Sequence, residues 1–306
     1  MATVSIHIVS YNALLLLQRC ITSLRQHTYT DYSLVVIDNG STDGTKEYLE
    51  SLTNVTCVFN EENKGFAYAH NQGIKESTSR YVLILNQDVV LAPLCLEKLV
   101  TFMESHSHCN AVQPRLLQSD IHGERTEYID SVGLTHHVWG QVTERGQGEH
   151  DWGQYYATSK VFGVTGACAL YRRDVLEQIK IGSEYFDSDF FMYKEDVDLA
   201  YRLRRKGGEA WYVSDAIAYH GRTVGKQIPL SKRSLQSRIL SFSNSVCVVI
   251  KNERMYVWPL ASMYVCVYVL RIIIKDFSIL RPSFMRLWLY AHKMYMKRYE
   301  ALNTTR

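Results

Sequence analysis

A short apolar run that ends in one carboxylate, Leu83–Val90, constrains the fold of this chain more than any other stretch. Runs of this kind are typical of strands buried on both faces of a sheet. In an open parallel sheet, ligands bind just outside the carboxyl ends of the strands, so Asp88 is placed where a cation and a phosphate can meet. Taken alone, Asn86 and Asp88 fit a simple turn after a strand equally well.

Strand-like and helix-like patterns alternate before this run. Strands are predicted at residues 3–10, 32–37, 55–59 and 80–86, and helices at 13–26, 45–51 and 66–76. This β-α-β-α-β-α-β order predicts an α/β fold with three layers, a mostly parallel sheet and right-handed crossovers.

Polar residues follow each of these strands. They are Ser10-Tyr11-Asn12, Asp38, Asn63-Lys64-Gly65 and Asp88. An acidic residue after the second strand can accept hydrogen bonds from a nucleobase or a ribose. Singly, Asp38 also fits a turn, and Gly65 fits a turn that needs a positive φ. The polar residues after all four strands are expected at one edge of the sheet, and together they favour a ligand site.

Composition limits the class of protein. The chain is 46% hydrophobic and 21% charged, which is typical of a globular protein. Its seven cysteines form no C-x-x-C pair, so we expect buried or free thiols in a reducing compartment and no zinc site. No basic segment precedes an apolar stretch at the N-terminus, and a signal peptide is not expected.

Five motifs together carry a resemblance to a known family. They are Val36–Thr45, Asn63–Gly73, Leu85–Asp88, Thr165–Arg173 and Lys194–Gly207. In this order, over roughly residues 3–225, they resemble the family 2 glycosyltransferases of the GT-A type. Within that family they resemble bacterial rhamnosyltransferase-like enzymes of O-antigen and cell-surface polysaccharide synthesis. The resemblance implies a GT-A nucleotide-diphospho-sugar transferase fold. It also implies inverting, metal-dependent transfer of a sugar from a nucleotide diphosphate to a glycan or lipid-linked glycan.

The resemblance also implies roles for individual residues. Nucleotide-sugar binding is expected at Ser10, Tyr11, Asn12, Asp38, Asn63, Gly65, Asn86 and Asp88, and the acceptor side at Gly166 and Glu195. Asp88 and His220 are the expected ligands of a divalent cation, Mg²⁺ or Mn²⁺.

The motif that ends in Asp88 departs from the common form of the family. Many relatives carry two carboxylates as D-x-D, whereas this chain has Asn86-Gln87-Asp88 and one anion. A histidine at the place of His220 is a ligand in some relatives, and imidazole suits Mn²⁺ better than Mg²⁺. A buried, hydrogen-bonded histidine explains His220 as well.

Asp196 is the expected catalytic base, because the family motif places its base there. It lies in the first turn of a predicted helix, where the helix dipole stabilises a carboxylate. An ordinary helix, with acidic residues early and basic residues late, accounts for Glu195 and Asp198. Asp187 and Asp189 are the reserve candidates for the base.

The last part of the chain differs from the rest. Residues 222–306 hold 15 basic and 3 acidic residues, although the net charge of the whole chain is +3. We expect a catalytic domain at 1–225 and a basic, amphipathic helical extension at 226–306. The apolar stretch 255–274 has the length of a membrane span, but Pro259, Arg271 and its tyrosines favour the interface.

Two interpretations of this extension stay open, which are helices lying on an anionic membrane and a helical subdomain packed on the catalytic part. The first predicts a cytoplasmic protein at the inner face of the cytoplasmic membrane.

Other functions were weighed against glycosyl transfer. A catalytically inert nucleotide-sugar or glycan-binding protein on the same fold is the main alternative, because only one carboxylate stands at Asp88. A nucleotidyltransferase would carry a glycine-rich loop after the first strand, and Ser10–Ala13 lacks one. No dinucleotide-binding or P-loop motif is present, and no nucleic-acid partner is expected. The expected donor is dTDP-rhamnose, with a UDP-sugar as the alternative.

Overall fold

The computed structural model describes residues 2–120, 123–221, 234–253, 258–275 and 279–303. Its strands are β1 (Val4–Ser10), β2 (Tyr32–Asp38), β3 (Val55–Phe59), β4 (Tyr81–Asn86), β5 (Val89–Leu91), β6 (Cys109–Ser119), β7 (Arg125–Ser131), β8 (Leu134–His136), β9 (Val142–Glu144), β10 (Ser159–Val161), β11 (Cys168–Arg172) and β12 (Glu209–His220). Its helices are α1 (Leu14–Arg25), α2 (Thr45–Glu50), α3 (Phe66–Lys75), α4 (Cys95–Ser105), α5 (Arg173–Ile179), α6 (Glu195–Arg205), α7 (Leu235–Asn252), α8 (Trp258–Lys275) and α9 (Leu280–Asn303), with a 3₁₀ turn η1 (Ser188–Phe190).

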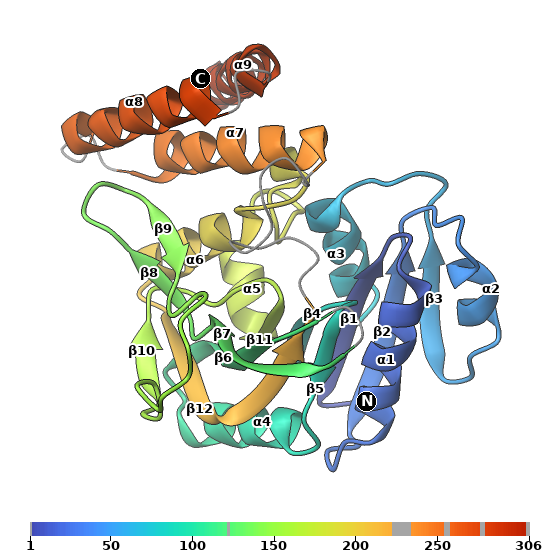
Figure 1. The fold of residues 1–306 in the computed structure, drawn as a ribbon. Coiled ribbons are helices and arrows are strands. Elements are labelled where there is room, and N and C mark those ends of the chain that lie inside the picture. Colours follow the sequence, from blue (N-terminus) through green and yellow to red (C-terminus); the bar gives the residue numbers. More distant parts are fainter. Residues whose placement is uncertain (1, 121–122, 222–233, 254–257, 276–278, 304–306) are drawn as a thin grey trace. The chain divides into compact units, whose positions relative to one another are not determined.

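The first four strands and three helices confirm the predicted alternation, with ends that differ by at most one residue. Strands β3, β2, β1 and β4 lie side by side and run parallel (Figure 1). Beyond β4 the sheet is mixed, in the order β11, β6, β12 and β10, with β5 paired to β12 and β7 paired to β6. This second half brings the end of β12 to the end of β4, which positions the site.

Helices cover both faces of the sheet, as predicted. Alternate residues of β4 point to opposite sides because the side-chain period of a strand is two. Leu83 and Leu85 belong to the core shared with α1 and α4, and Val82 and Ile84 belong to the core shared with α3, α5 and α6. The fold is therefore a three-layer α/β sandwich.

The chain divides into two compact units. One comprises residues 1–135, 143–191 and 195–227, which include the large sheet, and the other comprises residues 136–142, 192–194 and 228–306. In the second unit α7 packs on α9 around Phe242, Val246 and Ile279 (Figure 1). Among the residues that the structure describes, no helix combines the length and the apolar character that crossing a membrane requires. Part of the apolar stretch 255–274 lies outside these residues.

Candidate active site

The carboxyl ends of β1, β2 and β4 meet at one edge of the sheet. Ser10 pairs with Asp38 across β1 and β2, and Val9 pairs with Asn86 across β1 and β4. The register therefore brings the predicted residues of three strands together, as the parallel order predicts.

Gln87 joins the end of β4 to the end of β1. Its Oε1 accepts a hydrogen bond from the Ser10 hydroxyl at 2.8 Å and another from the Tyr11 backbone N–H at 3.1 Å. Ser10 is fully buried, whereas the Tyr11 side chain is exposed. Tyr11 is thus held at its backbone, and its ring is available to a ligand. Gln87 is not among the site residues predicted from the sequence.

The loop after β2 lies against the start of α1. Asn12, at φ +46°, accepts a hydrogen bond from the Thr42 N–H at 2.8 Å, and its own N–H donates to the Ser41 hydroxyl at 2.9 Å. Asp38 is buried, and its Oδ2 accepts from the Ser41 N–H at 3.1 Å. Its Oδ1 is also buried and has no hydrogen-bond partner among the described residues. A hydrogen-bond donor stabilises a buried carboxylate oxygen, so Asp38 Oδ1 is suited to accept a hydrogen bond from an N–H or O–H group of a ligand.

Asn63 and Gly65 form the turn that leads into α3. The Gly65 N–H donates to Asn63 Oδ1 at 2.9 Å, and Asn39 Nδ2 donates to the Gly65 carbonyl at 3.2 Å. Gly65 has φ +85°, and a Cβ there would lie 2.6 Å from the ring and carbonyl of Phe191. The turn therefore requires glycine at this position.

Asp88 and His220 approach each other at the ends of β4 and β12. Asp88 Oδ1 lies 3.2 Å from His220 Nε2, and Asn86 Nδ2 lies 3.5 Å from the same nitrogen. On the other side of the ring, His220 Nδ1 lies 2.8 Å from Asp130 Oδ2. Burial by itself lowers the pKa of His220, but the charges of Asp88 and Asp130 and the hydrogen bonds to them outweigh burial, and the pKa is raised to about 9. The pair of carboxylates thus favours a positive charge at this point.

The Asp88–His220 pair fits a divalent cation. Two neighbouring ligands of an octahedral ion at 2.0–2.1 Å lie about 3 Å apart, which is close to the separation of Asp88 Oδ1 and His220 Nε2. Within the described part of the chain, no group of three or more His, Cys, Asp or Glu side chains is arranged to hold a metal ion. An ion bound here would therefore need ligands besides Asp88 and His220, such as the oxygens of a diphosphate.

Asp196 and Gly166 are in contact. Asp196 Oδ2 accepts from the Gly166 N–H at 3.0 Å, and Oδ1 accepts from the Val197 N–H at 2.7 Å. Asp196 is the second residue of α6, and the N-terminus of a helix stabilises a negative charge. A Cβ on Gly166 would meet only ordinary contacts, so glycine there is not required by space.

The other carboxylates of this region have structural partners. Asp187 caps η1 by accepting from the Asp189 N–H at 3.0 Å. Asp198 is fully buried and pairs with Arg202 at 2.9 Å, and Arg202 also donates to the carbonyls of Ile179 and Tyr185. Asp198 therefore belongs to the core and not to a solvated helix face.

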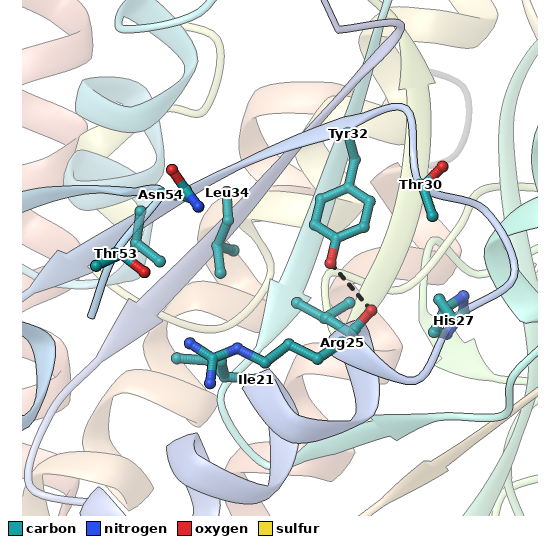
Figure 2. Close-up of a pocket in the computed structure, with 10 residues that line it drawn as sticks. Ile21, Arg25, His27, Thr30, Tyr32, Leu34, Thr53 and Asn54 are labelled. Carbon is teal, nitrogen blue, oxygen red and sulfur yellow. Dashed lines mark hydrogen bonds between the residues drawn. The ribbon is translucent and has the colours of Figure 1, made fainter.

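A cavity of about 440 Å³ lies elsewhere in the same unit, at the amino-terminal ends of β2 and β3 (Figure 2). Its lining includes Arg25, His27, Tyr32 and Asn54. The Tyr32 hydroxyl donates to the Leu24 carbonyl at 3.0 Å. Because the cavity is at the opposite ends of the strands from Asp38 and Asp88, it is separate from the candidate active site.

Comparison with known proteins identifies the family. The sequence model described as "Glycosyl transferase family 2" matches residues 5–180, which is more than half of the chain. The chain belongs to glycosyl transferase family 2. This family 2 glycosyltransferase is similar to an N-acetylglucosaminyl-diphospho-decaprenol L-rhamnosyltransferase of Mycobacterium tuberculosis, strain H37Rv. The two are 27% identical over 226 residues, which cover 67% of this chain and 71% of the relative. An uncharacterized glycosyltransferase of Haemophilus influenzae is 30% identical over 113 residues, which span 36% of this chain and about a third (35%) of that protein.

Solved structures confirm the GT-A fold of this glycosyltransferase. GalNAc-T7 with UDP, GalNAc and Mn²⁺ has a TM-score of 0.62 at 18% identity, over 81% of this chain and 48% of that chain. The mannosyltransferase PcManGT from Pyrobaculum calidifontis, in complex with GDP-Man and Mn²⁺, has a TM-score of 0.56 at 16% identity, over 95% of this chain and 84% of that chain. At these identities the likeness concerns the fold alone.

Proposed function

We propose that this glycosyltransferase moves a sugar from a nucleotide-diphosphate donor to a hydroxyl of a glycan or lipid-linked glycan, with inversion at the anomeric carbon. The favoured donor is dTDP-rhamnose, since the Mycobacterium tuberculosis relative is named as an L-rhamnosyltransferase that acts on a diphospho-decaprenol substrate. A UDP-sugar is the second candidate, because UDP is bound to the similar GalNAc-T7 structure.

The observation that carries the proposal is that side chains suited to bind a nucleotide and a cation lie together at one edge of the sheet. Asp38 Oδ1, which has no hydrogen-bond partner in the part of the chain that the structure describes, offers an acceptor for an N–H or O–H of a nucleobase or ribose. Asp88 and His220, 3.2 Å apart, would hold a Mg²⁺ or Mn²⁺ ion against the diphosphate. Such an ion, when bound, supplies Lewis-acid stabilisation of the leaving diphosphate. In the proposed site His220 supplies the second ligand that the single carboxylate of the motif lacks, and this favours an active enzyme over the catalytically inert alternative.

In the proposed reaction Asp196 is the general base. A carboxylate oxygen of Asp196 accepts the proton of the acceptor hydroxyl, while the hydroxyl oxygen attacks the anomeric carbon. The new C–O bond forms on the face opposite the departing diphosphate, and the bond between the anomeric carbon and the diphosphate oxygen breaks. Asp196 lies at the N-terminus of α6, where the helix dipole stabilises the negative charge of a carboxylate that acts as a base. Gly166, held at 3.0 Å from Asp196, and Glu195 are the proposed neighbours of the acceptor.

A donor screen tests the proposal. The midpoint of thermal unfolding would be measured with dTDP, UDP and GDP, each with and without Mn²⁺, because a ligand of the native state raises its stability. We expect an increase with one nucleotide that depends on Mn²⁺ and is lost in Asp88→Ala. An increase that survives in Asp88→Ala would contradict the metal site, and no increase with any nucleotide would contradict the donor site.

We also propose that the residues after 225 attach the enzyme to an anionic membrane, where a lipid-linked acceptor would be found. Several large apolar side chains are exposed on each of two of the three described helices of this part: Leu260, Met263, Val267 and Leu270 on α8, and Phe284, Met285, Trp288 and Leu289 on α9. The surplus of 12 positive charges in residues 222–306 complements anionic lipid head groups.

Sedimentation with vesicles tests the membrane proposal. We expect binding to vesicles of phosphatidylglycerol, weaker binding to phosphatidylcholine, and loss of binding in the double variant Trp288→Ala with Leu289→Ala. Trp152→Ala, which removes an 80% exposed tryptophan from the sheet-containing unit, is the matched control. Equal binding by both variants would refute the attachment through α9.

A further inference from the structure

Asp130 is a buried carboxylate beside the candidate metal site. It lies on β7, is 0% exposed, and its Oδ2 lies 2.8 Å from His220 Nδ1. It reaches His220 through the sheet, because β7 pairs with β6 and β6 pairs with β12. A buried carboxylate loses its hydration, so it needs a hydrogen-bond partner that offsets the cost of desolvation.

The contact decides which nitrogen of His220 carries a proton. A neutral imidazole has one N–H and one lone pair, and an ionised carboxylate can only accept. With Asp130 at Nδ1, the proton of neutral His220 is on Nδ1 and donates to Oδ2. The lone pair is then on Nε2, the nitrogen that lies 3.2 Å from Asp88 Oδ1. The same hydrogen bond prevents rotation of the ring.

We propose that Asp130 is a positioning residue, which fixes the tautomer and the orientation of His220 so that Nε2 can bind a divalent cation together with Asp88. This inference rests on the metal site of the proposed function. Asp130 is not itself a ligand of that ion, because the imidazole ring stands between its Oδ2 and Asp88. The arrangement selects a transition ion such as Mn²⁺ over Mg²⁺, because imidazole is a better ligand for the former.

The substitution Asp130→Asn tests this role. An asparagine can turn its NH₂ group toward Nδ1, which forces the proton onto Nε2 and removes the lone pair from the metal side. Carboxylates that orient a ligating histidine typically contribute 10–100-fold to metal affinity. We therefore expect Asp130→Asn to weaken Mn²⁺ binding by about 10–100-fold, measured by electron paramagnetic resonance of free Mn²⁺ with UDP and, separately, with dTDP. Binding of the same nucleotides without metal should stay as in the wild type.

The chain offers a matched control. Glu127 lies on the same strand and contacts another histidine, His150, at 2.9 Å. Glu127→Gln makes the same change from carboxylate to amide beside a histidine that is not in the site. Its Mn²⁺ affinity should equal that of the wild type. The ¹⁴N coupling of bound Mn²⁺ should be present in the wild type and Glu127→Gln, and weakened in Asp130→Asn.

Reference variants separate the failure of this inference from the failure of the metal site. If Asp88→Ala and His220→Ala both bind Mn²⁺ like the wild type, the metal site is wrong. If these two lose Mn²⁺ but Asp130→Asn retains it, the positioning role of Asp130 is wrong and the metal site stands. Should Asp130→Asn fail to fold, the tautomer can be measured in the unmutated protein. With Zn²⁺ as a diamagnetic probe, ¹⁵N spectra should show a proton on Nδ1 of His220, and a proton on Nε2 would overturn the proposal.

Discussion

Each residue of Asn86-Gln87-Asp88 has a distinct contact. Asn86 lies near His220, Gln87 accepts hydrogen bonds from Ser10 and Tyr11, and Asp88 faces His220. With asparagine in place of the first carboxylate of D-x-D, the motif has one anion, Asp88, and His220 of β12 lies opposite it. Gln87 therefore contacts β1, and Asp88 faces the site of the proposed cation.

Gln87→Ala should weaken nucleotide binding. The change removes the acceptor of two hydrogen bonds, at 2.8 and 3.1 Å, that hold Ser10 and Tyr11. A net hydrogen bond contributes about 1 kcal/mol, so we expect the dissociation constant of the donor nucleotide to rise about 5–30-fold in isothermal titration calorimetry. Gln26→Ala, at an exposed position after α1, is the control. Equal affinities of the two variants would show that Gln87 has no part in the donor site.

Asp196→Asn should abolish most of the transfer and leave donor binding intact. A general base contributes about 10²–10⁴-fold, and we expect kcat to fall by that factor while the dissociation constant of the nucleotide stays the same. Asp189→Asn is the comparison, since Asp189 is the reserve candidate whose backbone N–H already donates to Asp187. A large loss in Asp189→Asn with a small one in Asp196→Asn would transfer the role to Asp189.

At the scale of the elements, the start of α6 depends on an unusual turn. Phe191, Tyr193 and Lys194 have φ values of +63°, +69° and +75°, which bulky residues rarely adopt. Within the helical unit, Asn244 of α7 donates to the carbonyls of Met192 and Tyr193 at 2.8 and 2.9 Å. The turn therefore keeps its strained backbone because α7 binds it, and Asp196 follows it by two residues.

Asn244→Ala should loosen this turn and misplace Asp196. We expect faster hydrogen exchange at residues 192–197, because two hydrogen bonds to the turn are lost. We also expect kcat to fall about tenfold, which corresponds to about 1.4 kcal/mol, with KM for the donor unchanged. The control Ser245→Ala lies on the same helix and removes a hydroxyl that donates to the Ser241 carbonyl of α7 at 2.7 Å. If exchange at 192–197 is the same in both variants, Asn244 does not support the turn.

The sequence predicted the elements better than the contacts between them. Strands β1 to β4 follow from short apolar runs, and the positive φ of Gly65 follows from its place in a turn. The apolar run before Asp88 placed this residue at the ligand edge of the sheet, whereas its pairing with His220 came from the family resemblance and not from any pattern in the chain. The sequence did not predict the contacts of Asp130 and Gln87, because their partners lie 90 and 77 residues away along the chain. Neither side chain stands in a local pattern that distinguishes it from an ordinary strand or turn residue.

Helix α6 shows a second limit of prediction. Asp198 and Arg202 are four residues apart and look like a solvated ion pair on an amphipathic helix. Both are buried, because α6 lies against the sheet on one side and against the carbonyls of Ile179 and Tyr185 on another. Burial of this kind depends on tertiary packing, which the spacing of charges along one helix does not contain.

At the scale of the whole molecule, buried histidines make the free energy of unfolding depend on pH. Burial, with a smaller effect of Arg173, lowers the pKa of His7 from 6.5 to about 3. Burial also lowers the pKa of His27 and His70. Between about pH 6.5 and pH 3 the unfolded chain binds a proton at His7 that the folded protein does not bind. The free energy of unfolding therefore falls as the pH falls through this window.

Urea unfolding at pH 7.5, 6.5, 5.5 and 4.5 checks this dependence. Each such histidine lowers the free energy of unfolding by at most about 1.4 kcal/mol per pH unit below 6.5. We expect His7→Gln to reduce the slope by about that amount, whatever its effect on stability at pH 7.5. His108→Gln, at an exposed position, is the control. His220 adds nothing below about pH 6, because its raised pKa keeps it protonated in both states. An unchanged slope in His7→Gln would contradict the assignment.

The bonds from Asn244 to Met192 and Tyr193 also bear on recombination between relatives. Residues 192–194 belong to the helical unit, although they lie in the chain just before α6 of the sheet-containing unit. A chimera that exchanges everything after residue 225 would therefore separate α7 from the backbone it binds. We expect such chimeras to be inactive unless the relative that supplies the helices also supplies residues 192–194. A crossover that preserves activity would therefore be discontinuous along the chain.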